Sequence, residues 1–425
     1  MKKTLSKIIL LALSLIMIMS VLSSCVITPG EDYISREELD DILGSIIAGD
    51  VTIENAPTYN IEIEGDANRN VAAAAKAVLS AVSVYATFEL GYTSGINSTG
   101  TAAGAGVIYK IDKTRGDAYI ITNYHVVYES RAKTANKISD DIVLRLYGYE
   151  DTATGKHPEY DIPATFIGGS MTEDLAVLKV TGSKILAESA ATAVTFANSD
   201  EVSILDTAIA IGNPSSEGIS ATLGCINVDS EYVNITTADG STTQTQRLFR
   251  IDTPVNSGNS GGGLFNDKGE LIGIVNAKAS SYSVENVGYA IPGNLTRYVV
   301  ENIIHHCDGS DETYGYKYML GITLGSKDLT ALYDSETGKV HKTETVFVAS
   351  IDDGTAAGEV SQVGDVIKAI TIDGKTYEIT RMYQVIDCMF NVRADSTLSI
   401  TLISSDGTER TESIDVSKMT AKKIA

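Results

Sequence analysis

Cysteine is scarce in this chain, with four residues among 425. Beyond the N-terminal region the cysteines are Cys225, Cys307 and Cys388, and no CxxC spacing occurs among them. This excludes both a dense disulfide framework and a zinc signature of the usual spacing. We expect the three thiols to behave as buried small apolar residues, although pairing of two of them stays open in an oxidising compartment.

Basic residues are also few. Lys and Arg number 33 against 55 Asp and Glu, which gives a net charge of −22. A surface of this sign repels polyphosphate and argues against nucleic acid as a partner. The composition, 43% hydrophobic and 21% charged, is that of an ordinary globular protein, and the length suffices for two or three domains.

The apolar run at the N-terminus is too short for a membrane-spanning helix. It covers 15 residues, from Ile8 to Leu22, and follows a basic start formed by Lys2, Lys3 and Lys7. Small residues come directly after it. This pattern predicts a secretory signal peptide over residues 1–24, so that the rest of the chain is exported.

The end of this signal, Leu22-Ser23-Ser24-Cys25, resembles a bacterial lipoprotein signal. The resemblance implies that Cys25 is lipidated and becomes the mature N-terminus, which would anchor the protein to the outer face of the bacterial cytoplasmic membrane, in the cell envelope. An uncleaved N-terminal anchor, or a simple secretory signal with an incidental cysteine, is the alternative. Residues 25–69 then form a lipid-attached tether with a linker, and the capping box of Ser35 and Glu38 predicts a helix over 36–47.

Many short strand-like segments with few helices follow, and this pattern predicts closed antiparallel barrels. An alanine-rich helix over 71–79 precedes the strands, and a helix over 295–306 closes the region. The expected strands are 82–88, 105–110, 118–122, 142–146, 162–167, 175–180, 207–211, 220–228, 248–252, 263–265 and 271–277.

The composition changes again at residues 315–417, which we expect to form a small, separate β-rich domain. Its predicted elements are strands near 321–324, 345–351, 364–370, 397–403 and 410–416, and a helix over 381–390. The last residues, 418–425, are expected to be a frayed tail.

The stretch Asn256-Ser257-Gly258-Asn259-Ser260-Gly261-Gly262 predicts a tight turn that presents a serine hydroxyl. Glycines on both sides of Ser260 allow bare backbone N–H groups to face the group that the hydroxyl attacks, as acyl transfer requires. A flexible Gly/Ser turn between two strands is the alternative. A nucleophilic serine further requires a base and a carboxylate that orients it.

The candidate base is His125, which follows an apolar strand. His157 lies in a loop next to a proline, His305 and His306 stand at a helix C-terminus, and His341 lies in a polar insertion. The expected position of His125, at a buried edge that leads into a loop, favours it over the other four.

The candidate orienting acid is Asp174, at the entry to the apolar strand Leu175–Val180. Its neighbour Glu173 competes for this role. Strand alternation would point the two side chains to opposite faces, so only one of them can meet His125.

The order His125, Asp174, Ser260 is that of chymotrypsin, and five motifs in this order extend the similarity. Together AYIITNYHVV, DLAVLKV, AIGNP, GNSGGGLF and VGYAIP resemble the HtrA (Deg-type) serine proteases over about residues 70–417. The resemblance implies a mainly β fold, in which a trypsin-like double six-stranded antiparallel β-barrel over 70–307, with the barrel boundary near 185–200, is followed by a PDZ domain over 315–417.

The same resemblance implies the roles of the site residues. His125 would be the general base, Asp174 would orient it and Ser260 would be the nucleophile of a serine endopeptidase that needs no cofactor. The oxyanion hole would lie at Gly258, Asn259 and Ser260, with the N–H groups of Gly258 and Ser260 as its donors.

The third segment would bind peptide C-termini. Met319, Leu320, Gly321 and Ile322 resemble the carboxylate-binding loop of PDZ domains, whose ligand adds a strand to the sheet edge. A domain that only spaces or regulates the protease is the alternative.

The specificity pocket is expected at Pro254 and at Asn276, Ala277 and Lys278. Proline in place of an acid at position 254 argues against a preference for Lys or Arg. Lys278 would favour an acidic or polar partner if it pointed inward, and we expect a small or medium-sized uncharged preference.

Two departures from the family are visible. Tyr124 stands where relatives usually have a smaller or polar residue, and the loop between Val127 and Ile142 is short, which favours a monomer or homotrimer over a large cage. The expected substrates are unfolded or damaged exported proteins. Loops 211–219 and 255–259 would decide whether the resting site is competent.

Two other function classes are alternatives. A non-catalytic protease-like scaffold that keeps peptide binding is disfavoured by the intact set of three residues. A metal-dependent hydrolase built on His305, His306 and Asp308 is disfavoured because adjacent helical side chains do not converge on one ion.

Overall fold

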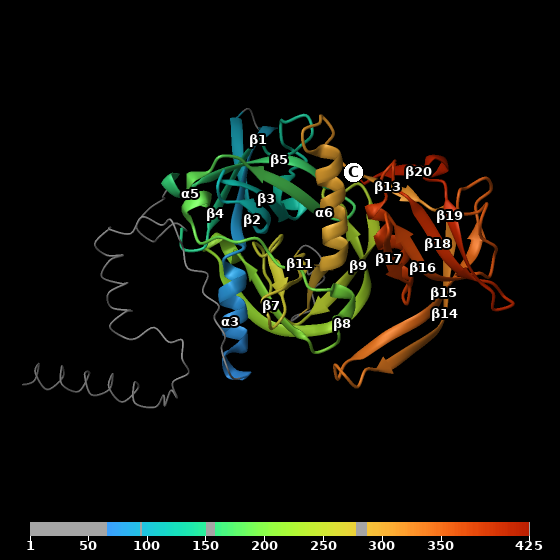
Figure 1. Ribbon diagram of the computed structural model, residues 1–425. Helices are drawn as coiled ribbons and strands as arrows, with labels where there is room; N and C mark the ends of the chain where they lie inside the picture. Colours follow the sequence, from blue (N-terminus) through green and yellow to red (C-terminus); the bar gives the residue numbers. More distant parts are fainter. Residues whose placement is uncertain (1–65, 94–95, 150–157, 278–286, 425) are drawn as a thin grey trace, which may run out of the picture. The chain divides into compact units, whose positions relative to one another are not determined.

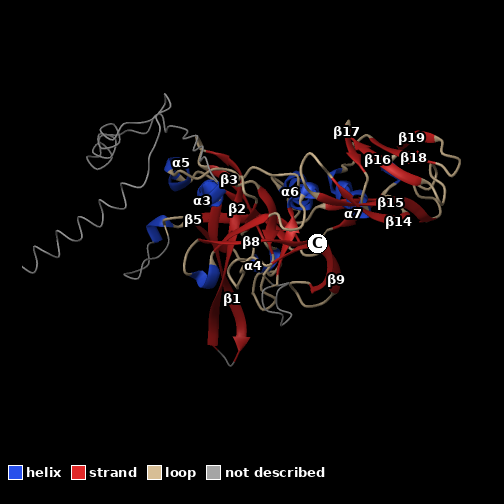
Figure 2. Cartoon of the chain, turned by 90° about the horizontal axis from the view of Figure 1, so that it is seen from below, coloured by secondary structure: helices blue, strands red, loops and turns tan. Residues whose placement is uncertain are grey.

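The computed structural model describes residues 66–93, 96–149, 158–277 and 287–424 (Figure 1). The predicted signal peptide, the lipidation site Cys25, the helix over 36–47 and the pocket residue Lys278 lie outside the described residues. Strands far outweigh helices throughout the described part (Figure 2), as the sequence predicts.

The first six strands close into a barrel in the order β1-β2-β3-β6-β5-β4, with all neighbours antiparallel. Its interior is filled by aliphatic side chains such as Val84, Ile120, Leu144 and Leu178, which are completely or almost completely buried. The strands are β1 (Ala81–Thr93), β2 (Ile96–Asp112), β3 (Asp117–Thr122), β4 (Asp141–Leu146), β5 (Ile162–Ser170) and β6 (Leu175–Val180).

The next six strands close into a second antiparallel barrel, in the order β10-β11-β12-β9-β8-β7. The predicted double barrel is therefore confirmed. The strands are β7 (Thr207–Gly212), β8 (Ser220–Thr236), β9 (Thr243–Ile251), β10 (Gly263–Phe265), β11 (Leu271–Val275) and β12 (Gly288–Pro292).

Two features of the second barrel differ from the expectation. Strand β12 was not expected as a strand, although it is needed to close the barrel between β9 and β11. Strand β8 runs to Thr236 instead of Val228 and pairs with β9 in a long hairpin. The extension carries mostly polar, partly exposed residues, so hydrophobic alternation does not reveal it.

Helices connect and cover the barrels. Helix α6 (Gly293–Cys307) packs against β5 and β6 of the first barrel and β11 of the second, so its apolar face joins the two (Figure 1). The other helices of this part are α3 (Asp66–Val78), α4 (Tyr124–Val127) and α5 (Lys184–Glu188), and short 3-10 turns lie at Pro158–Tyr160, Ser199–Glu201 and Pro214–Ser216.

The C-terminal segment builds its own sheet and its own hydrophobic core. The sheet has the order β14-β15-β16-β18-β19, with β17 beside β16. The elements are β13 (Tyr316–Met319), β14 (Ile322–Tyr333), β15 (Val340–Ile351), β16 (Val366–Ile372), β17 (Lys375–Glu378), α7 (Met382–Cys388), β18 (Leu398–Ile403), β19 (Glu409–Ile414) and β20 (Thr420–Lys423), with 3-10 turns at Met389–Asn391 and Val416–Lys418.

The expectation of a frayed tail is wrong. Strand β20 pairs antiparallel with β13, from Thr420 opposite Met319 to Lys423 opposite Tyr316, and Ile424 is buried. The polar sequence of the tail conceals this pairing, because backbone hydrogen bonds to β13 hold it and its strand residues stay exposed.

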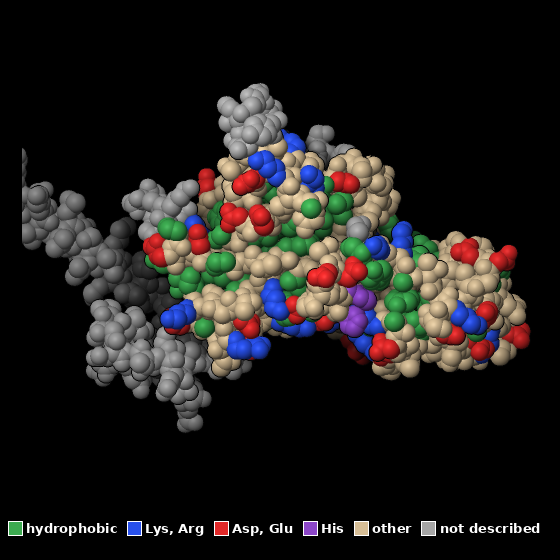
Figure 3. All heavy atoms as spheres, turned by 90° about the horizontal axis from the view of Figure 1, so that it is seen from above, with side chains coloured by type: hydrophobic (Ala, Val, Ile, Leu, Met, Phe, Trp, Pro, Cys, Tyr) green, Lys and Arg blue, Asp and Glu red, His purple; other side chains and the backbone are tan. Residues whose placement is uncertain are grey.

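Charged pairs join the C-terminal sheet to the second barrel. Arg247 of β9 binds Asp387 of α7 at 2.6 Å, with both side chains buried, and its guanidinium lies 3.8 Å from the ring centre of Tyr383. Asp229 of β8 binds Lys342 at 2.6 Å and Arg381 at 3.4 Å. Elsewhere, basic and acidic side chains are interspersed on the surface, as Figure 3 shows for one face.

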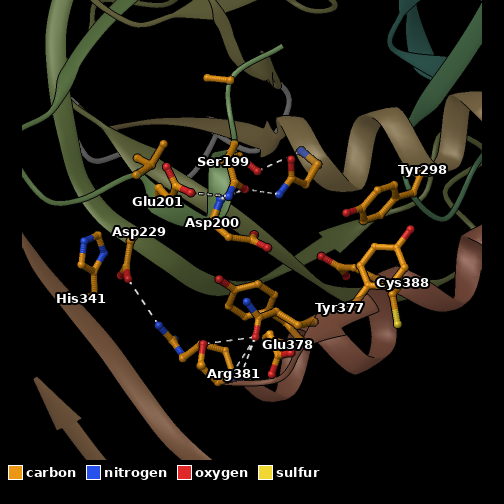
Figure 4. Close-up of a pocket in the computed structure, with 18 of the residues that line it drawn as sticks. Ser199, Asp200, Glu201, Asp229, Tyr298, His341, Tyr377, Glu378, Arg381 and Cys388 are labelled. Carbon is orange, nitrogen blue, oxygen red and sulfur yellow. Dashed lines mark hydrogen bonds and ion pairs between the residues drawn. The ribbon is translucent and has the colours of Figure 1, made fainter. Parts of the chain in front are cut away.

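Between these segments lies a cavity of about 700 Å³ (Figure 4). Asp229 and Arg381 face each other at one side of it, and Tyr298 and Tyr377 lie at the other. His125, Asp174 and Ser260 are not among the residues that line it, so it is separate from the site predicted from the sequence.

Asp387→Asn tests the buried pair. Burial raises the pKa of Asp387 and Arg247 opposes that rise, so removal of the carboxylate leaves a buried guanidinium unpaired. We expect the free energy of unfolding, measured with urea, to fall by about 3–5 kcal/mol. Glu409→Gln, which breaks the exposed pair with Lys368, serves as the control and should change stability far less. Equal effects of the two substitutions would contradict this account.

Candidate active site

His125 lies in the one-turn helix α4, directly after β3. Its ring Nδ1 is 2.7 Å from Oδ2 of Asp174, and its backbone N–H donates to Oδ1 of the same carboxylate at 3.0 Å. The two contacts fix the ring plane and leave Nε2 pointing away from the carboxylate. About 20% of the side chain is exposed, so this nitrogen can be reached from solvent.

Asp174 occupies the turn between β5 and β6, with a left-handed φ of 52° and 5% exposure. This conformation is uncommon for residues other than glycine, and it persists where the surroundings over-determine it. Here the Asp174 carbonyl oxygen accepts bonds from the Tyr124 N–H at 3.2 Å and from Nδ2 of Asn123 at 2.8 Å. The backbone of the acid is thus tied to the segment that carries the histidine.

Glu173 does not compete for His125. Burial raises the pKa of its carboxyl group, and the charges that act on it are those of Lys317, Asp387 and Arg247. The two acids do point apart, but strand alternation is not the reason, because β6 begins only at Leu175. The turn geometry at Asp174 separates them.

Asn276 makes a contact that the sequence did not indicate. Its Nδ2 donates to Oδ2 of Asp174 at 3.1 Å, and its side chain is fully buried. The carboxamide of Asn276 therefore holds the acid, and the expected place of this residue in the specificity pocket stays a prediction. Asn276 follows β11 of the second barrel, so both barrels contribute hydrogen bonds to this carboxylate.

Ser260 lies in the glycine-rich turn between β9 and β10. Its carbonyl oxygen accepts the N–H of Ala105 in β2 at 2.8 Å. Gly261 has a φ of 84°, and a Cβ on it would lie 2.3 Å from the carbonyl oxygen of Ala105 and 2.9 Å from the N atom of Asn123. Glycine here allows the serine turn to press against the first barrel beside α4.

No hydrogen bond joins the Ser260 hydroxyl to His125 among the described residues. The hydroxyl and Nε2 are therefore both available to a bound substrate. In substrate-free sites such bonds are often long and tighten only in the complex.

Both expected oxyanion donors of this turn lack an acceptor within the described residues. Within the described residues the N–H groups of Gly258 and Ser260 donate to no other group, whereas the N–H of Asn259 donates to the Asn256 carbonyl oxygen at 3.0 Å. The backbone N–H of Asn259, a residue expected in the oxyanion hole, is therefore already occupied. Gly258 has a φ of 98°, and a Cβ there would lie 2.1 Å from the carbonyl oxygen of Asn213, so only glycine fits.

Two other residues expected in the specificity pocket, Pro254 and Ala277, are among the described residues. Pro254 is exposed, and its carbonyl oxygen accepts the Thr222 hydroxyl at 2.8 Å. Ala277 is partly exposed after β11.

Tyr124, the bulky neighbour of the base, packs against Tyr128 and Phe166 with ring centres 5.6 and 6.2 Å away. A Cβ at residue 169 would lie 2.6 Å from the Tyr124 ring, so Gly169 makes room for it. Burial raises the pKa of Tyr124 to about 12, which keeps its hydroxyl protonated at neutral pH.

The predicted peptide loop spans the end of β13 and the start of β14. Leu320 is buried and Met319 is exposed, and Gly321 has a φ of 73°. The carbonyl oxygen of Gly321 accepts the Asp352 N–H and the Thr355 hydroxyl, both at 3.0 Å. Its own N–H and that of Leu320 donate to no group in the described part of the chain.

The described cysteines are free thiols. Cys307 and Cys388 are buried as expected, whereas Cys225 is partly exposed and its Sγ lies 3.3 Å from Oδ2 of Asp252. Of the residues weighed for a metal site, Asp308 is already bound by Lys179 at 2.7 Å and Tyr119 at 2.6 Å. The helices in the described ranges are too short or too polar to cross a membrane.

Comparison with known proteins places this geometry in context. A family described as "Trypsin-like peptidase domain" matches residues 104–274. The chain is 31% identical to the serine protease Do-like HtrA of Lactococcus lactis subsp. lactis, over 76% of this chain and 72% of the relative. It is 30% identical to a probable periplasmic serine endoprotease DegP-like of Chlamydia trachomatis serovar D, over 62% of this chain and 45% of the relative.

Among solved structures, the chain is similar to the HtrA-type protease AlgW with a decapeptide. That match has 23% identity and a TM-score of 0.48 and covers 83% of this chain and 98% of the other.

Asn276→Ala tests the contact with the acid. Loss of one hydrogen bond to a charged group costs about 1.5–3 kcal/mol, so kcat/KM for a peptide ester should fall about 10- to 100-fold. KM should change little, because the carboxamide faces Asp174. Asn391→Ala, which removes a carboxamide bonded to the Cys388 carbonyl oxygen in the C-terminal segment, is the control. An increase in KM with kcat unchanged would instead indicate that Asn276 lines the substrate pocket.

Proposed function

Because this chain belongs to the HtrA family of serine proteases and is a serine endopeptidase, we propose that His125, Asp174 and Ser260 are its catalytic triad. The observation that carries the proposal is the pair of contacts from His125 to one carboxylate of Asp174, beside a serine turn docked on the same barrel. The protease domain would span residues 70–307.

The reaction follows from these positions. The Ser260 oxygen bonds to the carbonyl carbon of the scissile peptide while its proton passes to Nε2 of His125. The carbonyl oxygen becomes an anion, which the N–H groups of Gly258 and Ser260 stabilise. The imidazolium, held by Asp174, then gives its proton to the departing amine as the C–N bond breaks.

An ester on Ser260 remains after this step. Water attacks the ester carbon and loses a proton to His125, and the ester bond then breaks, so that Ser260 takes the proton back and the carboxylic acid product leaves. Each atom and proton is accounted for without a cofactor.

We propose further that the protease acts outside the cytoplasm, anchored by a lipid on Cys25, on unfolded or damaged exported polypeptides. The basic start and the apolar run within residues 1–24 support export, and one relative is named as probably periplasmic. The substrate class rests on the resemblance to the family.

The C-terminal segment, residues 315–417, would be a PDZ domain that binds peptide C-termini. Two N–H groups, of Leu320 and Gly321, have no acceptor among described residues and could hold a terminal carboxylate. Strand β14 pairs only with β15 within the described sheet, so its other edge could accept a peptide strand.

Ser260→Ala tests the nucleophile. We expect wild-type protein to react with a fluorophosphonate probe and the variant not to react, with peptidase activity falling about 10⁶-fold. The matched control is Ser257→Ala in the same turn, whose exposed hydroxyl is not in the proposed triad and whose labelling should persist. Wild-type protein that stays unlabelled would favour the alternative, a non-catalytic scaffold that only binds peptides.

Peptide capture is tested in the Ser260→Ala background, so that the ligand is not cut. A fluorescent peptide with a free C-terminal carboxylate should bind about 10- to 100-fold more tightly than its amide, measured by anisotropy, because charge-assisted bonds to N–H groups are lost in the amide. Gly321→Val should abolish the difference, since a Cβ at residue 321 would lie 2.3 Å from Thr355. Equal binding of both peptides would contradict carboxylate recognition and favour the alternative, a domain that only spaces or regulates the protease.

A further inference from the structure

The β8–β9 hairpin of the second barrel reaches the turn that carries Asp174 in the first barrel. Gln244 and Gln246 are two residues apart on β9, so their side chains emerge on the same face of the hairpin. Each carboxamide donates a hydrogen bond from Nε2 to the carbonyl oxygen of Thr172. One backbone oxygen therefore accepts hydrogen bonds from two side chains of the other barrel.

Thr172 stands two residues before Asp174 in a tight turn. Within this turn the Ser170 hydroxyl accepts the Glu173 N–H at 3.1 Å and lies 3.0 Å from the Thr172 hydroxyl. These local bonds come from neighbouring residues and move with the turn. The two glutamines are the contacts that fix the Thr172 carbonyl to a separate element, which a turn with a left-handed aspartate requires.

The burial of Gln246 supports a specific role. The residue is 7% exposed, and its Oε1 is buried without a hydrogen-bond partner. A buried acceptor without a partner is costly, and rotating the carboxamide by half a turn would place Oε1 against the Thr172 oxygen. The donor orientation is thus determined by the Thr172 carbonyl.

We propose that Gln246, assisted by Gln244, is a positioning residue for Asp174. It acts through the Thr172 carbonyl and holds the acid where it meets His125. The inference rests on the proposed triad. The second barrel then binds the acid in two places. Asn276 donates a hydrogen bond to its carboxylate, and the two glutamines donate to the turn that carries it.

The same strand continues toward the C-terminal segment. Arg247, next to Gln246, binds Asp387 of α7.

The first test is kinetic. Gln246→Met keeps the length of the side chain but removes the donor, and we expect kcat to fall about 3- to 10-fold with KM unchanged. Gln246→Glu should cost more, because a carboxylate repels the carbonyl oxygen. Thr245→Val is the control, since Thr245 faces the opposite side and bonds Asn234 at 2.8 Å. Unchanged kcat in Gln246→Met would overturn the proposal.

The second test is a double-mutant cycle, read as the rate of fluorophosphonate labelling. Asp174→Ala alone should slow labelling strongly, and in that background Gln246→Met should have no further effect. The same fold loss in both backgrounds would show a general structural role and overturn the proposal. Full labelling of Asp174→Ala would instead refute the triad itself.

Gln244→Met repeats the cycle at a partly exposed position, so that a poorly folded Gln246 variant cannot obscure the result. We expect a smaller loss of kcat, which again disappears without Asp174. Additive losses at residue 244 would contradict the proposal. Thermal unfolding midpoints ensure that only folded variants are compared.

Discussion

The carboxylate of Asp174 is the point on which the site depends. It accepts the ring and backbone N–H of His125 from one barrel and the carboxamide of Asn276 from the other. A buried carboxylate is stable only when its oxygens are satisfied, so both barrels must close around it before the histidine has a fixed orientation. The active geometry is therefore a property of the packed barrels and of no single segment.

Close approach of the serine turn is the second constraint. Gly258, Gly261 and Gly262 each lie where a Cβ would meet a backbone oxygen at 2.1–2.3 Å, from residues 213, 105 and 211. The contact of Gly261 with Ala105 brings Ser260 against β2, and within the described residues the N–H groups of Ser260 and Gly258 have no acceptor. The conformational freedom of glycine is used here to place a backbone.

The C-terminal segment has a core of its own, and ion pairs beside a cavity join it to the barrels. Buried charges that bridge two segments are sensitive to loss of either partner, which makes such a junction specific rather than strongly stabilising. The hairpin β8–β9 contributes Asp229 and Arg247 to this junction. Through Gln244 and Gln246 it also binds the turn that carries Asp174. One hairpin thus touches both the C-terminal segment and the catalytic region.

The sequence predicted what local patterns encode. Strands such as Leu175–Val180 and Gly263–Phe265 appear at the predicted bounds, and the pairing of His125 with Asp174 follows the motif order. Strand β12, the tail strand β20 and the extension of β8 were not predicted, because they are short or polar and are held by backbone pairing with distant strands.

By itself the sequence determined closed antiparallel barrels, the residue types of the site and their order, since hydrophobic alternation and glycine spacing act over a few residues. The double barrel was implied by the resemblance to the family. Only the tertiary structure decided the partners: Asn276 bonds Asp174, Glu173 lies away from His125, and Gln246 bonds the Thr172 carbonyl. Such pairings depend on the register and approach of strands up to about a hundred residues apart, which no local pattern specifies.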